Sequence, residues 1–156
     1  MCLDIKVNFP HLVLAEGVEN GYEWVVTHND IGYRCGYVRV PKGHPWHGQD
    51  YNDIDANVHG GLTFARPDIE CGKGGEDDAW WVGFDCAHCY DAVDPELLAR
   101  SSKGTEGQRL YDLYTQGKYS FLFRSDELRT IKTQEYVEKE CRELCHQAFE
   151  AAKQTN

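Results

Sequence analysis

The carboxyl-terminal segment constrains the fold most strongly, because its apolar residues recur with the period of an α-helix. The apolar positions are Val137, Cys141, Leu144, Cys145, Ala148 and Phe149, and charged or polar residues lie between them. This spacing puts the apolar side chains on one face of a helix. We therefore predict an amphipathic helix over residues 133–152 that packs across a β-sheet.

The sheet itself is predicted from segments rich in aromatic and β-branched residues. Residues 22–27 and 33–40 have this character and are separated by turn residues, so they should form a hairpin. Two more strands are expected at residues 57–64 and 79–86. The predicted fold class is therefore α+β, with a mainly antiparallel sheet of about four to five strands on the carboxyl-terminal helix. The apolar patch at residues 9–14 is assigned neither to a helix nor to a strand.

Length and charge limit the classes of partner. The 156 residues suit a single domain spanning residues 1–156, and base rates alone favour a homodimer. The net charge of −10, without a basic cluster, argues against binding to long DNA or RNA but not against a small nucleotide held by a local Arg or Lys. No apolar run approaches the ~20 residues of a membrane span. The amino terminus lacks a secretory signal, so we expect a cytoplasmic protein without a membrane partner.

Alternation along the strands sorts residues between the two faces of the sheet. Val38, Val40, Val82 and Phe84 fall on the face expected beneath the helix. The opposite face is predicted to carry Tyr37, Arg39, His59, Thr63, Trp81 and Asp85, with Gly61 and Gly83 among them. Glycine within a strand often marks the close approach of a ligand or of another backbone. This face is interpreted either as a small-molecule pocket or as a solvated surface.

Three strings carry a resemblance to a known group of proteins. They are Val40-Pro41-Lys42-Gly43-His44-Pro45, Val58-His59-Gly60-Gly61-Leu62-Thr63-Phe64, and Trp80-Trp81-Val82-Gly83-Phe84-Asp85-Cys86-Ala87-His88 followed by Asp91. From about Tyr33 to the final helix, the chain resembles a family of small uncharacterised proteins encoded by phages and prophages. Many relatives carry Ala-Gly in place of Cys89-Tyr90, which argues against a Cys86/Cys89 metal pair as a shared feature.

The resemblance implies a phage context, and hence the cytoplasm of an infected host cell. It implies no established reaction. Small phage proteins of this kind counter host defence, some by destroying or sequestering nucleotide immune signals. An anti-defence role toward such a signal is an expectation that follows from the resemblance.

The leading functional hypothesis is a hydrolase or phosphodiesterase that acts on a small nucleotide-like substrate. His59 and His88 would be general base and acid, because imidazole titrates near neutral pH, and Asp85 would orient a histidine or a metal. The substrate-binding residues expected around them are Arg39, Lys42, His44, Gly60, Gly61, Thr63, Trp81 and Asp91. Asp85 and His88 would point to opposite faces of a straight strand, so the hypothesis requires the chain to bend after Asp85.

A second hypothesis is metal-dependent hydrolysis. The side chains of His59, Asp85, His88 and Asp91 offer nitrogen and oxygen ligands suited to a divalent zinc, manganese or iron ion, although their spacing matches no strong metal motif. Residues 86–89 contain one Cys-x-x-Cys pair, which is a weak zinc indication without a second pair. No cofactor is required by the sequence.

Other hypotheses use the same residues differently. Cys86 lies near His88 in the sequence and could act as a nucleophile. The alternative interpretation is that Cys86 is a thiol buried in the core. His44 would either contact substrate or order its loop by bonding the backbone. A protein that sequesters a nucleotide without turnover would need the same polar residues, and an acidic decoy for a host protein is a further alternative. The sequence does not separate these functions.

Overall fold

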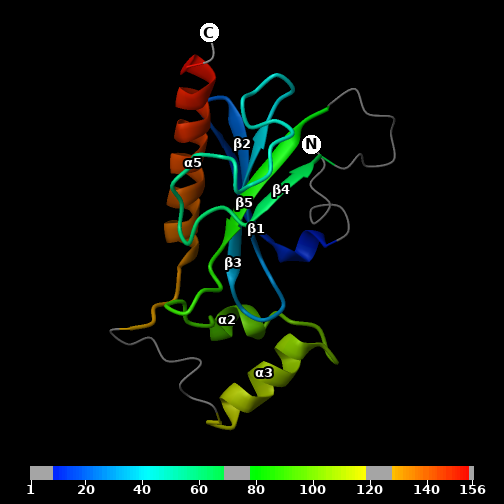
Figure 1. The fold of residues 1–156 in the computed structure, drawn as a ribbon. Helices are drawn as coiled ribbons and strands as arrows, with labels where there is room; N and C mark the ends of the chain where they lie inside the picture. The colour runs from blue at the N-terminus through cyan, green and yellow to red at the C-terminus, as the bar shows by residue number, and fades with distance from the viewer. Residues whose placement is uncertain (1–8, 69–77, 119–127, 155–156) are drawn as a thin grey trace.

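A computed structural model describes residues 9–68, 78–118 and 128–154 of the chain. The elements are a 3-10 helix at Pro10–Leu12, β1 Val13–Glu19, β2 Tyr22–His28, β3 Arg34–Val40, β4 Phe64–Pro67, β5 Trp80–Asp85, α2 Pro95–Leu98, α3 Glu106–Thr115 and α5 Gln134–Gln154. The strands form one antiparallel sheet in the order β1-β2-β3-β5-β4 (Figure 1). The α+β class, the β2–β3 hairpin and the final helix are thus confirmed.

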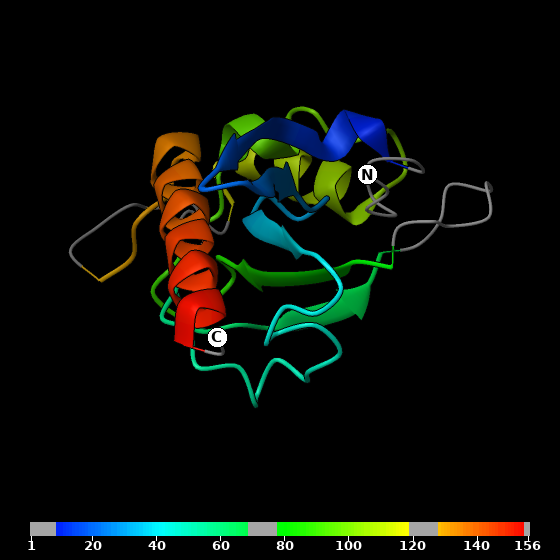
Figure 2. The ribbon, with the colours of Figure 1, turned by 90° about the horizontal axis from the view of Figure 1, so that it is seen from above.

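Helix α5 covers one face of the sheet, chiefly against β2 and β3 (Figure 2). The apolar positions of its helical pattern are buried there, as the periodicity predicts. The main contributors to this core are Val26, Val38, Val40, Val82, Phe84, Val137, Cys141, Leu144, Cys145 and Ala148. Burial of this apolar surface is the dominant force that fixes the helix on the sheet.

The other face of the sheet is not the open polar surface that alternation suggested. Trp81 and Val25 are completely buried there and pack with Tyr37 and Phe64. Gly83 makes room for an aromatic ring of the protein, since a Cβ at this position would lie 2.5 Å from Cδ1 of Tyr37. The aromatic residues on this face therefore form a second, smaller core.

The strand predicted at residues 57–64 is wrong for most of its length, because β4 begins only at Phe64. Gly60 and Gly61 have φ angles of +67° and +85°, which a strand does not adopt. Val58 and Leu62 still pack against the main core, so the apolar alternation is real but belongs to a turn. This turn brings His59 away from the sheet face and toward α5.

The end of the sheet where β5 stops is closed by α2 and α3 (Figure 1). Val93 and Leu98 form a third cluster with Tyr33, Leu110 and Tyr111. A buried ion pair of 2.7 Å joins Arg34 of β3 to Asp94, the N-cap of α2. In the ranges that the structure describes, no helix combines the length and apolar character needed to cross a membrane.

Candidate active site around His59, His88 and Asp91

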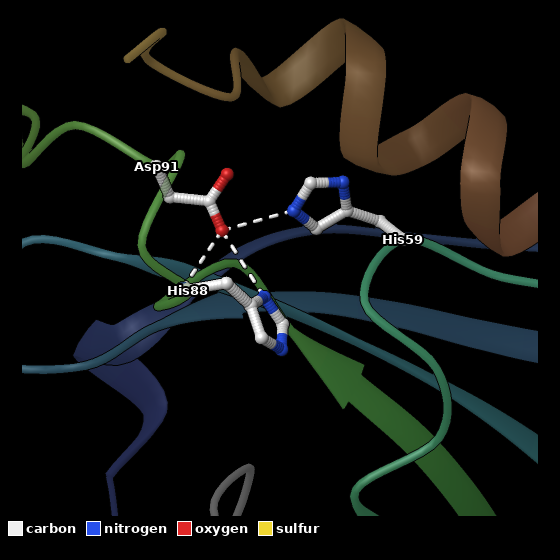
Figure 3. A group of neighbouring side chains, drawn as sticks. All are labelled: His59, His88 and Asp91. Carbon is white, nitrogen blue, oxygen red and sulfur yellow. Dashed lines mark hydrogen bonds and ion pairs between the residues drawn. The ribbon is translucent and has the colours of Figure 1, made fainter. Parts of the chain in front are cut away.

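Asp91 is the centre of a cluster of polar side chains just beyond the end of β5. Its side chain is completely buried, yet both neighbouring imidazoles remain partly exposed. One oxygen, Oδ2, lies 2.9 Å from His59 Nε2, 3.2 Å from His88 Nδ1 and 2.9 Å from the backbone N of His88 (Figure 3). Two histidines that are distant in sequence therefore share one carboxylate oxygen.

His59 is held in place from the amino-terminal half of α5. Its backbone N–H donates to Glu140 Oε2 at 2.8 Å, and its Nδ1 lies 3.1 Å from the Tyr136 hydroxyl. The turn itself is closed by the Gly61 N–H, which donates to the Val58 carbonyl. Both ring nitrogens of His59 therefore have a partner, and the ring orientation is fixed.

Gly60 is required by the position of His88. A Cβ on Gly60 would lie 2.1 Å from Cε1 of the His88 ring, which no real contact allows. The positive φ angle of Gly60 adds a second reason for glycine, because other residues are strained in that region. The His-Gly-Gly string is thus explained by packing between the turn and His88.

The chain bends after Asp85, as the hydrolase hypothesis required. Asp85 Oδ1 accepts the Ala87 N–H at 3.0 Å, and the Asp91 N–H donates to the His88 carbonyl at 2.9 Å. As a result His88 Nε2 comes within 3.9 Å of Asp85 Oδ1. Thr63 donates its hydroxyl to the other Asp85 oxygen at 2.9 Å.

The electrostatics of the cluster favour an ionised Asp91. Burial raises the pKa of its carboxyl, but hydrogen bonds from His59 and from the His88 backbone outweigh burial and lower the pKa overall. The Lys132 ammonium lies 3.7 Å from Asp91 Oδ1. Burial, together with the charge of Glu140, raises the pKa of Tyr136, so its hydroxyl stays protonated beside His59 Nδ1.

Arg39 and Lys42 do not reach this cluster, which corrects their predicted role as phosphate ligands there. Arg39 Nε binds Asp68 Oδ2 at 2.9 Å, and Lys42 pairs with Asp78 at 3.1 Å. Arg39 is opposite Trp81 in the sheet register, whereas the cluster follows Asp85 at the other end of β5. Four strand residues separate these ends by about 13 Å.

Trp81 and His44 are likewise buried away from the cluster. Trp81 has no exposed surface on which a base could stack, so that prediction is wrong. His44 Nε2 donates to the Ala148 carbonyl at 2.8 Å, and His44 Nδ1 accepts the Trp46 N–H at 3.0 Å. His44 therefore orders its loop against the carboxyl-terminal half of α5, which was the second of its two interpretations.

The cysteines offer no alternative centre in the described ranges. Cys86 is buried, and burial together with the nearby Asp91 charge raises the pKa of its thiol, which opposes a nucleophilic role. Cys89 is exposed. Among the described residues, the group with metal-ligand geometry consists of His59, His88 and Asp91, without either cysteine.

Sequence reasoning did not identify Tyr136, Glu140 or Lys132 as neighbours of the cluster. All three lie at or just before the start of α5, more than 40 residues from His88. Their polar character alone is typical of any exposed helix, so the sequence held no signal for this role. Asp91 was expected to bind substrate or metal, and the structure shows that it also joins the two histidines.

A separate cavity of about 540 Å³ lies near the β2–β3 turn. Its lining includes Leu12, His28, Cys35, Tyr37 and Arg100, and it does not include the cluster residues.

Comparison of the chain with protein families, curated proteins and solved structures finds no match.

Proposed function

We propose that the protein is a hydrolase that cleaves a phosphoester bond in a small nucleotide-like molecule, with His59, His88 and Asp91 as its water-activating centre. One observation carries the proposal: a fully buried carboxylate oxygen joins two imidazoles that remain 16% and 33% exposed. A buried acid that fixes partly exposed imidazoles is the arrangement that proton transfer at neutral pH requires.

The reaction needs groups that remove and deliver protons beside the attacked phosphorus. A water oxygen forms the new bond to phosphorus, the P–O ester bond breaks, and a proton from water ends on the leaving oxygen. In this proposal His88 and His59 carry out these transfers, and ionised Asp91, within hydrogen-bond distance of both rings, stabilises positive charge on either one.

The surroundings of the centre fit an anionic, aromatic substrate. Lys132, which contacts the Tyr136 ring and lies 3.7 Å from Asp91, supplies positive charge in a protein whose net charge is −10. Tyr136, which contacts His59, is 37% exposed, and Tyr90, which precedes Asp91 in the sequence, is 66% exposed; such rings stack nucleobases. Lys132 thus takes the charge role first assigned to Arg39, and the two tyrosines take the stacking role first assigned to Trp81.

The phage-family resemblance suggests the biological setting of this reaction. We propose that the substrate is a nucleotide immune signal of the host, so that hydrolysis serves anti-defence in the host cytoplasm. The resemblance supports this step, and the geometry of the centre supports only the chemical class.

The test is incubation of the purified chain with a panel of nucleotides and cyclic dinucleotides, followed by chromatography. We expect His88→Ala and His59→Gln to lose about 10²-fold or more of the turnover, as removal of a general acid or base does. The matched control His146→Gln removes an exposed histidine on the carboxyl-terminal half of α5 and should keep full activity. Equal turnover in all variants would refute the proposed centre.

Sequestration without turnover is the alternative function. The observation in its favour is that both ring nitrogens of His59 are engaged, one by Asp91 and one by Tyr136. The same panel separates the two functions, because a sequestered ligand disappears from solution and returns intact after heat denaturation. If no ligand changes or disappears, a protein partner for the acidic surface becomes the better hypothesis.

A further inference from the structure

Two imidazoles and one backbone N–H approach a single oxygen, Asp91 Oδ2, and so outnumber its lone-pair directions. A carboxylate oxygen has two lone-pair directions. Asp91 Oδ2 is approached by three nitrogens, at 2.9, 2.9 and 3.2 Å. The backbone N–H of His88 occupies one direction, which leaves two imidazoles for the other.

Asp91 Oδ1 shows the opposite situation. It is buried and accepts no hydrogen bond within the described residues, and its charged neighbour Lys132 is 3.7 Å away. A hydrogen-bonded network would distribute the donors over both oxygens. The two imidazole nitrogens and Oδ2 also all lie within 4.8 Å of one another, a spacing at which three ligand atoms can surround one ion.

We propose that His59 Nε2, His88 Nδ1 and Asp91 Oδ2 bind a divalent transition-metal ion such as Zn²⁺. In this proposal one cation replaces the protons that lie between the two imidazoles and Oδ2. A lone pair of each imidazole nitrogen and the remaining lone pair of Oδ2 would then bind the same ion. The separations of 2.9 and 3.2 Å also fit, since metal–ligand bonds of ~2.0–2.1 Å place neighbouring ligands about 2.9–3.4 Å apart.

The outward nitrogen of His59 has a hydrogen-bond partner, and that of His88 has a carboxylate as its neighbour. His59 Nδ1 meets the Tyr136 hydroxyl at 3.1 Å, and His88 Nε2 faces Asp85 Oδ1 at 3.9 Å. Such partners orient the ring and strengthen the ligand. Asp85 thus acts on the ion through His88 and is a positioning residue.

The chemistry of the set selects the class of ion. Two imidazoles and one carboxylate suit zinc, manganese or ferrous iron, whereas copper(I) prefers sulfur ligands, which this set lacks. Three protein ligands leave coordination positions for water or substrate, as in catalytic zinc sites. The partial exposure of both histidines gives solvent access to those positions.

The inference deepens the proposed function, because a bound ion would activate the hydrolytic water. Its own test does not depend on turnover. The full-length chain is stripped with chelator and titrated with Zn²⁺ by calorimetry, and Co²⁺ loading is followed by visible absorption. We expect one ion per chain and at least tenfold weaker binding in His59→Gln and Asp91→Asn.

Control variants distinguish specific Zn²⁺ binding at these three residues from incidental binding elsewhere on the protein. His146→Gln should bind the ion as the wild-type chain does. Because loss of a buried carboxylate can unfold the protein, His88→Gln is measured as well, and circular dichroism checks the fold of each variant. Absence of stoichiometric binding, or unchanged affinity in folded His59→Gln and His88→Gln, would overturn the proposal.

The two proposals can fail separately. If Zn²⁺ binds at the three residues but no substrate of the panel is cleaved, the metal site stands and the hydrolase proposal fails for those substrates. If cleavage persists in chelator and the titration finds no stoichiometric binding, the centre works by imidazole chemistry and the metal proposal is wrong.

Discussion

The face of the sheet opposite α5 and the turn region after β5 both combine aromatic, acidic and basic residues, but they use them differently. On the sheet face, Arg39 is paired with Asp68 and Trp81 is fully buried, so neither side chain is open to a ligand. In the turn region, His59 and His88 remain partly exposed around a buried Asp91.

The difference follows from the backbone. Within a sheet, neighbouring side chains stand in fixed register and pack against each other, so the aromatic rings on this face cover one another. At the end of β5 the chain turns, and three segments that are distant in sequence meet. A region of this kind can direct several side chains at one point, whereas a regular sheet face cannot.

The largest expected effect is a loss of stability at the second core, away from the proposed active site. Trp81→Ala should lower the free energy of unfolding by about 3–5 kcal/mol, because it empties a fully buried position. Urea denaturation measures this loss. The exposed control Val18→Ala should change stability by about 0.5 kcal/mol or less. A similar loss in both variants would mean that the second core contributes little.

An intermediate effect should appear in the turn region. Gly60→Ala adds a Cβ that collides with His88, and it also strains a backbone with φ of +67°. The control Gly43→Ala has a φ of +86° but no atom near the new Cβ, so it should show only the strain of about 1–2 kcal/mol. Gly60→Ala should lose more stability than this and also weaken Zn²⁺ binding.

Urea denaturation and Zn²⁺ titration of both glycine variants decide the matter. If Gly60→Ala equals Gly43→Ala in both measurements, the contact between Gly60 and His88 does not position the centre.

The smallest effect concerns pH and the structural histidine His44. Burial lowers the pKa of its imidazole below 6.5, although the hydrogen bond to Ala148 partly opposes this shift. The unfolded chain therefore binds a proton that the folded chain resists, and His44 contributes a loss of stability as pH falls from about 6.5 toward the folded pKa. Above 6.5 this contribution is absent.

Urea denaturation at pH 7.5 and at pH 5.5 measures the difference. His44→Gln should reduce the drop in stability between the two pH values, and the exposed His146→Gln should leave it unchanged. An unaltered drop in His44→Gln would show that other groups, such as buried His28, control the pH response.

Two missed elements had local signals in the sequence. Asn20-Gly21 has positive φ at both residues and joins β1 to β2, and this dipeptide is a strong hairpin indicator. Thr105 caps α3 by accepting the Gln108 N–H, and a Thr three residues before Gln is a known helix start. Both elements were predictable from residue type and spacing.

The sequence by itself determined the α+β class, the β2–β3 hairpin and α5. The apolar periodicity of each helix or strand lies within one segment of the chain, and it marks the side of that segment that becomes buried. It also indicated His59, Asp85, His88 and Asp91 as residues of interest. Only the tertiary structure decided that Asp91 joins the two histidines, that Tyr136 and Lys132 border them, and that Arg39 and Trp81 are excluded. Convergence of this kind depends on where turns direct the chain in space, and no local pattern records that direction.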